Sequence, residues 1–450
     1  MPVKKFLKEV TIMALLSRIC ILILQFFFNV LIPNHQSDGF ISPANYISKS
    51  KVDHIIELIF GGLVCWDAQY FLHISIYGYV YENTLAFFPG YPYCIKSVGF
   101  IIQILCQFGN ILSIHLCCAV FLNILFFVLS ARTLFRLTYK ELRNEKIAYI
   151  ACVLFCINPA SIFFTAPYSE TLFSYLTFNA MLHENVSSCC IYIALSAIVR
   201  SNGIINVGFP LYRELKRFLN KPSNCYNIIL FSCNIFKIII CSLCLFITYQ
   251  IYSYYQFCSF FNYLFDKNIL KLAEEKSFIL AGNNTSDMCK SFIPYLYVQS
   301  YYWNVGFLEY FKLKQLPNFI LASPIFYFIA IQNTQYFLQK KHLIRTLGLI
   351  RTSKSEIDDH IIIYVIHSVV LLLVCLFFVH IQVTTRLLCS SSPIPYWFAA
   401  KLIYPDVNIE LNFSFKRHYN FSLITHVIIF YCLLYCLIGT ALFSNFYPWT

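Results

Sequence analysis

Charged residues are scarce in this sequence. Of its 450 residues only 12% are Asp, Glu, Lys or Arg, whereas a soluble globular protein carries roughly 25%. Hydrophobic residues make up 59% of the chain, and the mean hydropathy is +0.65. A water-soluble fold does not account for this balance, so the composition indicates a protein that crosses a membrane several times.

Acidic residues are scarcer than basic ones, which leaves a net charge of +12. About half of the Lys and Arg fall in the N-terminal tail and in three short segments, as the positive-inside rule expects of cytoplasmic loops. These segments lie near 132–146, 213–221 and 338–354. The basic clusters therefore indicate topology, and we expect no nucleic-acid partner.

Several motifs of phosphate and metal chemistry are also missing. The chain has no Asp-x-Asp triplet, no Gly-rich phosphate-binding loop and no Cys/His cluster with zinc spacing. We therefore expect no bound metal and no other cofactor. Most of the 20 cysteines lie in apolar runs, where they behave as small hydrophobic residues. The cysteines placed where an oxidising lumen could pair them, in an order that stays open, are Cys65, Cys94, Cys258, Cys289 and Cys389.

Apolar runs long enough to span a bilayer recur along the whole chain. They lie near 10–33, 111–135, 147–165, 226–252, 317–337, 359–382 and 421–443. The block 171–211 is either one span or three short ones, broken at 183–185 and at 201–203. The count is about eight or about ten spans, and either even number predicts that both termini are cytoplasmic. We predict an all-α polytopic membrane protein with a single multi-span domain over residues 1–450.

On this topology four segments face the lumen, namely 34–110, 166–170, 253–316 and 383–420. The first of these lumenal loops carries amphipathic patterns over 55–63 and 66–77, which predict interfacial helices. The apolar stretch 86–108 is predicted to be interfacial or re-entrant. Glycosylation sequons at Asn283, Asn412 and Asn420 fall on the predicted lumenal side, whereas the one at Asn185 does not.

An acidic residue, Asp67, stands just past the first hydrophobic run, between Trp66 and the aromatic pair Tyr70 and Phe71. A carboxylate is costly to hold beside hydrocarbon, so it marks a candidate functional site. A second acid, Glu82, follows in the same loop. The alternative is that Asp67 only caps the helix that begins there.

The polar and aromatic residues of the predicted lumenal side concentrate in a few phrases. They are WDAQYFLHISIYGYVYENTLAFFPGYP (66–92), NPASIFFTAPYSE (158–170), AIVRSNGIINVGFP (197–210, side uncertain), PYLYVQSYYWNVGFLEYFKLKQLPNF (294–319), TTRLLCSSSPIPYWFAAKLI (384–403) and Tyr447-Pro448-Trp449. In this order and spacing, over essentially the whole chain, the sequence resembles the GPI mannosyltransferases that add the second mannose of the glycosylphosphatidylinositol (GPI) anchor, the PIG-V type.

The resemblance implies a multi-pass glycosyltransferase of the GT-C class in the endoplasmic reticulum membrane, with a lumenal active site. The donor would be dolichol-phosphate mannose and the acceptor a GPI-precursor glycolipid, joined by an α-1,6 bond. Besides the membrane lipids, a small accessory membrane subunit is left open as a partner. The missing metal and nucleotide motifs agree with a lipid-linked donor, whose single phosphate needs only a cation or amide groups.

A β-linked donor and an α-linked product require a single inverting displacement, in which one carboxylate deprotonates the acceptor hydroxyl. Asp67 is our candidate base, with Glu82 and Glu170 as alternatives; Glu170 could instead cap a helix. Arg386, and after it Arg200, are the candidates for the donor phosphate. The remaining candidates for substrate contacts, through stacking and hydrogen bonds, are Trp66, Gln299, Tyr302, Trp303, Asn304, Tyr396 and Trp397.

Two other functions compete with this prediction. One is a transferase that uses the same donor on another acceptor, such as an N-glycan precursor or a protein. The other is a lipid transporter or scramblase, which places its polar residues in broken helices at the membrane midplane. Because the polar residues here cluster in predicted lumenal segments, the sequence favours the transferase.

Overall fold

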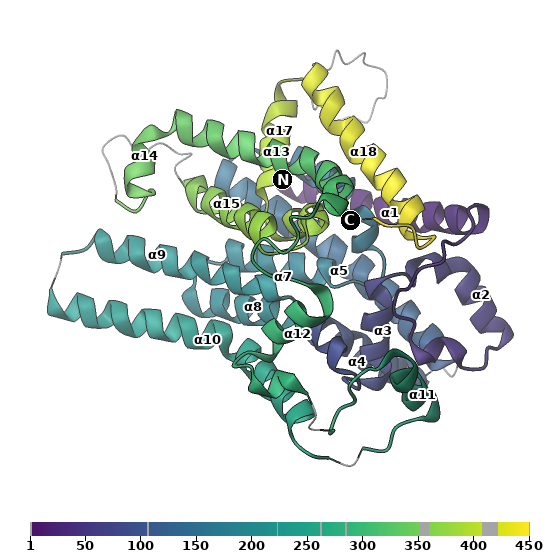
Figure 1. Cartoon of the computed structure of the whole chain (residues 1–450). Helices are drawn as coiled ribbons and strands as arrows, with labels where there is room; N and C mark the ends of the chain where they lie inside the picture. The colour runs from purple at the N-terminus through teal and green to yellow at the C-terminus, as the bar shows by residue number, and fades with distance from the viewer. Residues whose placement is uncertain are drawn as a thin grey trace.

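The computed structural model describes residues 2–105, 108–222, 224–261, 263–283, 286–350, 360–406 and 422–449. Helices make up most of these segments (Figure 1). No β-strand occurs within them; a single antiparallel bridge joins Tyr81 to Leu280. The predicted all-α class is confirmed.

Five helices in the described part of the chain are long and apolar enough to cross a membrane, judged by length and composition. They are α1 (Pro2–Leu31), α5 (Ile111–Leu142), α10 (Cys225–Cys258), α13 (Leu316–Gln339) and α18 (Leu423–Phe443). Shorter helices lie between them: α6 (Glu145–Cys156), α7 (Glu170–Leu182), α8 (Val186–Val199), α9 (Gly208–Leu219), α14 (Lys341–Thr346), α15 (Ile362–Phe377), α16 (Thr384–Ser391) and α17 (Ile394–Ile403).

The ambiguous block 171–211 is split into three helices, at both predicted breaks. After α7 ends, the Asn185 side chain accepts hydrogen bonds from the N–H groups of Ser187 and Ser188 and so caps α8. Helix α8 ends before Arg200, and the 3-10 segment Ser201–Val207 leads into α9. The run expected near 147–165 is likewise only partly helical. Helix α6 ends at Cys156, and Asn158 bonds the backbone of Phe155 and Ala160 in the turn that follows.

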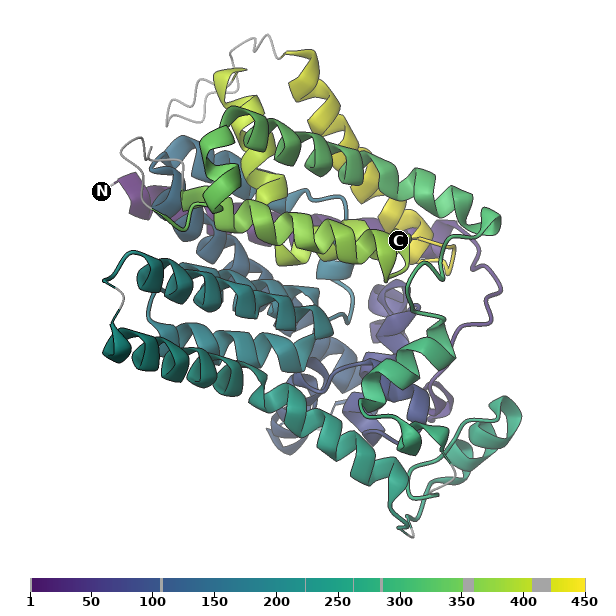
Figure 2. The ribbon, with the colours of Figure 1, turned by 60° about the vertical axis from the view of Figure 1, so that its left-hand side comes forward.

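The two ends of the described chain lie at opposite ends of the bundle (Figure 2), so the prediction that both termini share one side is wrong. Helices α1 and α18 pack together and run in the same direction. Asn29, near the end of α1, donates to the Ser444 carbonyl (2.9 Å), and the His35 N–H donates to the Asn445 carbonyl (2.8 Å). Near the start of α1, Phe6 instead stacks on Phe135, close to the end of α5.

The described part of the segment 383–420, residues 383–406, does not stay on the predicted lumenal side. Helix α16 begins near the start of α7, but α17 continues away from it, because the Trp397 indole N–H donates to Thr138 Oγ1 (2.7 Å) near the far end of α5. The sequons at Asn412 and Asn420 lie outside the described residues.

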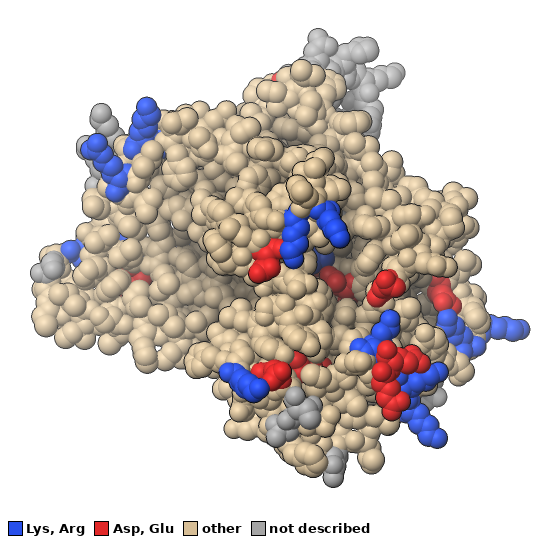
Figure 3. Space-filling view, viewed as in Figure 1, with Lys and Arg blue, Asp and Glu red and all other residues tan. Residues whose placement is uncertain are grey.

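Two long connections fold together into a cap over one end of the bundle. One contributes α2 (Lys51–Phe60), α3 (Asp67–Tyr77), the 3-10 segment Glu82–Ala86 and α4 (Gly90–Leu105); the other contributes α11 (Lys267–Lys276) and α12 (Pro294–Trp303). A disulfide between Cys258 and Cys289 closes the second connection. Charged side chains gather over the cap, over the connection after α12 and over α14, and leave most of the rest of this face uncharged (Figure 3).

The amphipathic patterns in the first connection do form helices. Helix α2 exposes most of its residues, as an interfacial helix would. Helix α3 is instead mostly buried, with Ala68 and Leu72 inside the main core. The stretch expected to be re-entrant forms α4. Helix α3 therefore carries its first residue, Asp67, on a rigid element rather than on a mobile loop.

Candidate active site

The site begins where the chain turns sharply into α3. Trp66 has φ +56°, a conformation that costs free energy for a non-glycine residue. The Asp67 N–H donates to the Tyr168 hydroxyl (3.0 Å), which fixes the first turn of the helix. No side chain caps α3, and the Asp67 carboxylate points elsewhere, so capping does not explain this acid.

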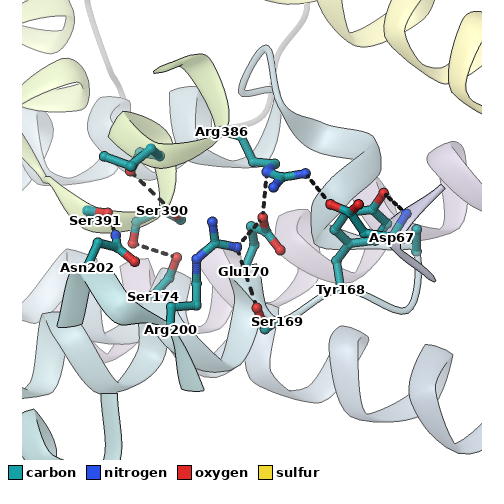
Figure 4. A network of polar contacts seen from close by, with 12 residues as sticks. Asp67, Tyr168, Ser169, Glu170, Ser174, Arg200, Asn202, Arg386, Ser390 and Ser391 are labelled. Atoms are coloured by element: carbon teal, nitrogen blue, oxygen red, sulfur yellow. Dashed lines mark hydrogen bonds and ion pairs between the residues drawn. The ribbon is translucent and has the colours of Figure 1, made fainter. Parts of the chain in front are cut away.

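Four charged side chains from four separate segments form one row (Figure 4). Arg386 Nη1 lies 3.2 Å from Asp67 Oδ2, and Arg386 Nε lies 3.0 Å from Glu170 Oε1. Arg200 Nη1 approaches the same Glu170 oxygen at 2.5 Å. Two acids and two arginines give a formally neutral row, in which Glu170 holds both guanidinium groups and Asp67 holds one.

The two acids of this row differ in their access to solvent. The Glu170 side chain is fully buried, whereas the Asp67 side chain is 31% exposed. Glu170 is also the first residue of α7, where the helix dipole favours a negative charge. Ser169, just before it, accepts a hydrogen bond from Arg200 (3.4 Å). Glu170 is therefore placed to orient the arginines, and Asp67 is placed to meet a ligand.

Asp67, Arg200 and Arg386 face a cavity of ≈ 440 Å³. This first cavity is of the size that binds small molecules, and it combines apolar walls with a few polar groups. Trp66, Gln299 and Trp303, all predicted to contact substrate, also line it. Its apolar wall includes Val374 and Phe378 at the end of α15. Further lining residues are Phe87, Phe163, Tyr168, Asn202, His380, Gln382 and Trp449.

The family model "Mannosyltransferase (PIG-V)" matches residues 7–450 of this sequence. The chain belongs to the PIG-V mannosyltransferase family. GPI alpha-1,6-mannosyltransferase 2 of Cricetulus griseus is 36% identical, over 98% of each chain. GPI mannosyltransferase 2 of Drosophila pseudoobscura pseudoobscura is 37% identical, over 99% of this chain and 100% of the relative. The Homo sapiens GPI alpha-1,6-mannosyltransferase 2 is 34% identical, over 98% of each chain.

A solved structure of an Archaeoglobus fulgidus oligosaccharyltransferase is a more distant match. It aligns at 11% identity with a TM-score of 0.45, over 96% of this chain and 55% of that chain.

Four of the residues predicted to contact substrate do not line the first cavity in this PIG-V family member. The Tyr396 hydroxyl donates to the Cys389 carbonyl (2.7 Å), and both Tyr396 and Trp397 are buried in the core. Asn304 is exposed and ends α12 in the left-handed conformation, with φ +50°. Tyr302 lies at a second cavity, where its hydroxyl approaches Glu82 Oε1 at 3.5 Å.

Glu82 is also removed from the row of charges. It is fully buried, and burial raises the pKa of its carboxyl. It does not line the first cavity. Of the three acids considered from the sequence, only Asp67 reaches that cavity.

His380 and Tyr168 were not singled out from the sequence, although both line the cavity. The His380 ring Nε2 hydrogen-bonds the Trp303 carbonyl (2.7 Å), the ring stacks on Tyr310, and burial lowers its pKa. His380 was overlooked because the sequence predicted a membrane helix over 359–382. In the structure α15 ends at Phe377, so His380 lies beyond it. Tyr168 could have been found from the sequence, because it lies two residues before Glu170 in one of the segments (158–170) that resemble the family.

Proposed function

We propose that this PIG-V family mannosyltransferase transfers mannose from dolichol-phosphate mannose, in α-1,6 linkage, to the first mannose of a GPI precursor. The reaction takes place on the lumenal face of the endoplasmic reticulum membrane. The names of the full-length relatives support the acceptor and the linkage. One observation carries the chemistry: a partly exposed acid, Asp67, shares a cavity with two arginines.

In the proposed reaction, the Asp67 carboxylate takes the proton of the acceptor hydroxyl while that oxygen attacks the anomeric carbon from the face opposite the phosphate. The bond between the anomeric carbon and the phosphate oxygen breaks, and dolichyl phosphate leaves. Arg386 and Arg200 stabilise the phosphate, which needs positive charge rather than a strong acid. Glu170 keeps both guanidinium groups aimed at it.

The Arg386 contacts suggest how the base becomes available. Arg386 pairs with Asp67 and with Glu170. A donor phosphate that competes for Arg386 would weaken its pairing with Asp67 and leave that carboxylate free to accept a proton. The base would then become active only when donor is in place.

Expression in cells that lack the second GPI mannosyltransferase tests the function, with GPI-anchored proteins at the cell surface as the readout. The wild-type chain should restore them. In vitro, Asp67→Asn should lower the transfer rate roughly 10²-fold or more while the protein still folds, because the amide cannot take a proton. The matched control is Asp287→Asn, since Asp287 is an exposed acid of the cap that pairs with Lys290. Near-normal transfer by Asp67→Asn would remove Asp67 as the base.

A further inference from the structure

A second cavity of ≈ 270 Å³ lies in the cap. Aromatic side chains form a large part of its wall, with Phe40, Phe278 and Tyr302 among them. Its polar groups are few: the Asp38 carboxylate, the Lys276 ammonium and the Asn83 amide. Flat apolar rings with a few hydrogen-bonding groups suit a sugar, whose ring has an apolar face and a rim of hydroxyls.

The two cavities are neighbours. Trp303 lines both of them. Tyr70 lines the second, packs against Trp303 with a centroid separation of 6.0 Å, and stacks on Phe87 of the first cavity at 4.4 Å. Asp67 and Tyr70 lie three residues apart on α3, hence on the same helix face about 5–6 Å apart. A ligand that reacts beside Asp67 therefore needs to extend by only one helical turn to reach the second cavity.

Asn83 is the feature of this cavity that points to a ligand. The residue is 3% exposed, and its Nδ2 donates a hydrogen bond to the Tyr70 hydroxyl (3.4 Å). Its Oδ1 is buried and has no hydrogen-bond partner among the described residues. A buried amide oxygen without a partner costs roughly 1–3 kcal/mol, so a ligand hydroxyl that donates to it would recover that loss.

The cap is built so that this cavity keeps its shape. The Ala281 N–H donates to the Val80 carbonyl (2.9 Å), and the Glu82 N–H donates to the Ile279 carbonyl (3.0 Å). These bonds tie α11, which carries Lys276, to the segment that carries Asn83. The contact of the Tyr302 hydroxyl with Glu82 positions Tyr302, another residue that lines this cavity.

We propose that the second cavity binds a sugar unit of the acceptor glycolipid other than the mannose that receives the new residue. The accepting mannose lies beside Asp67 in the first cavity, and the next part of the glycan crosses Trp303 and Tyr70 into the second. This inference rests on the proposed function and assigns its acceptor side to named residues, with the Asn83 amide as a specificity contact.

Steady-state transfer by the purified full chain in detergent tests the proposal, with labelled dolichol-phosphate mannose as donor. Two acceptors are compared: the GPI-precursor glycolipid and octyl α-mannoside, which lacks every other sugar. Asn83→Ala should lower kcat/KM for the glycolipid about tenfold, as expected for one lost hydrogen bond, and leave the donor KM and transfer to octyl mannoside unchanged. Lys276→Ala changes an exposed residue of α11 that also lines this cavity, and it should act in the same direction. The matched control is Asn268→Ala, an exposed amide of α11 that lines neither cavity.

The outcomes separate the two claims. Equal losses with both acceptors, or a raised donor KM, would show that Asn83 is structural and would overturn the proposal. Unchanged kcat/KM for the glycolipid in both Asn83→Ala and Lys276→Ala would overturn it as well. If the wild type does not use octyl mannoside, the two KM values of Asn83→Ala decide the question: the proposal requires a raised KM for the glycolipid and an unchanged KM for the donor. Failure of the wild type to transfer to any acceptor would instead refute the proposed function.

Discussion

Arg386 contacts two acids at once, and this double contact distinguishes it from Arg200. Arg386→Ala should raise the donor KM by roughly tenfold or more, because one of the two cations proposed for the phosphate is gone. Excess donor should restore part of the rate if the contact is mainly made in the ground state. Arg386→Lys should recover little, since an ammonium cannot reach both acids as a guanidinium does.

The donor KM of Arg386→Ala is measured by varying the donor concentration at saturating acceptor. Arg345→Ala serves as the control, because Arg345 is an exposed residue of α14. An unchanged donor KM in Arg386→Ala would assign the phosphate to Arg200 alone.

His73 is a buried histidine of the cap, and its titration makes stability depend on pH. Burial lowers its pKa from 6.5 to about 3. Below pH 6.5 the unfolded chain therefore gains a proton that the folded protein does not take, and stability is lost as the pH falls toward 3. At pH 5 the cost is about 2 kcal/mol for this residue.

Thermal unfolding in detergent at pH 7.5 and pH 5 tests this expectation. His73→Gln should lose about 2 kcal/mol less than the wild type between the two pH values. The exposed His54→Gln should lose as much as the wild type. An acid sensitivity that His73→Gln leaves intact would show that His73 is protonated in the folded protein.

At the residue scale, the sequence could indicate the chemistry but not the contacts. Asp67 and Arg200 stood out because a charged residue beside apolar sequence needs a partner or a function. Arg386 stood out because it lies next to a polar run of three serines. The structure brings all three together. Glu170 was considered as a base, whereas its position behind two arginines emerges only from the packing of α7, α8 and α16. Trp397 follows Arg386 closely in sequence, but the turn at Ser392 and Pro393 sends α17 into the core.

At the scale of elements, the cap is crosslinked by the disulfide between Cys258 and Cys289, which are 31 residues apart in the sequence. A crosslink over such a loop stabilises by roughly 3–4 kcal/mol in the chain-entropy model. Cys258→Ser with Cys289→Ser should therefore loosen the connection that carries α11, and protease should cut within 263–283 faster. Transfer to the glycolipid acceptor should fall with it.

Cysteines of the same helix offer the matched control for the disulfide. Cys225 and Cys233 are free and exposed on α10, so their replacement by serine should leave protease sensitivity unchanged. Equal protease sensitivity of the wild type and the Cys258/Cys289 double variant would show that the backbone pairing of 80–82 with 279–281 holds the cap by itself.

Helix existence was easier to predict from the sequence than helix length. Apolar runs located every long helix, and the polar breaks at 183–185 and 201–203 mark real helix ends. Hydropathy could not show that the run 147–165 stops being helical at Cys156, because the 3-10 segment Ser161–Phe164 after it is equally apolar. That segment is stabilised by Arg18 of α1, which donates to the Ser161 carbonyl (2.8 Å) and to Thr165 Oγ1 (2.9 Å).

At the scale of the whole molecule, the number of crossings decides which side each end of the chain faces. Short helices affect this number, and hydropathy counts them poorly. The parallel course of α1 and α18 places residues 445–449 at the end of the bundle that carries Asp67. The basic N-terminal tail should remain cytoplasmic.

Epitope tags in sealed microsomes test this topology. A tag before residue 1 should be cut by added protease, as should one near 346, whereas a tag after residue 450 should be protected until detergent is added. Cleavage of the tag after residue 450 in sealed vesicles would contradict the parallel course of α1 and α18.

The row of two acids and two arginines has a consequence for turnover. In the proposed reaction, the donor phosphodiester would bring about one negative charge to the arginines, whereas the dolichyl phosphate left after transfer would carry about −1.5 to −2 near neutral pH. Arg200 and Arg386 should thus hold the spent carrier more tightly than the loaded one. Dolichyl phosphate should therefore inhibit the enzyme as a product, and its escape into the bilayer would slow each cycle of transfer.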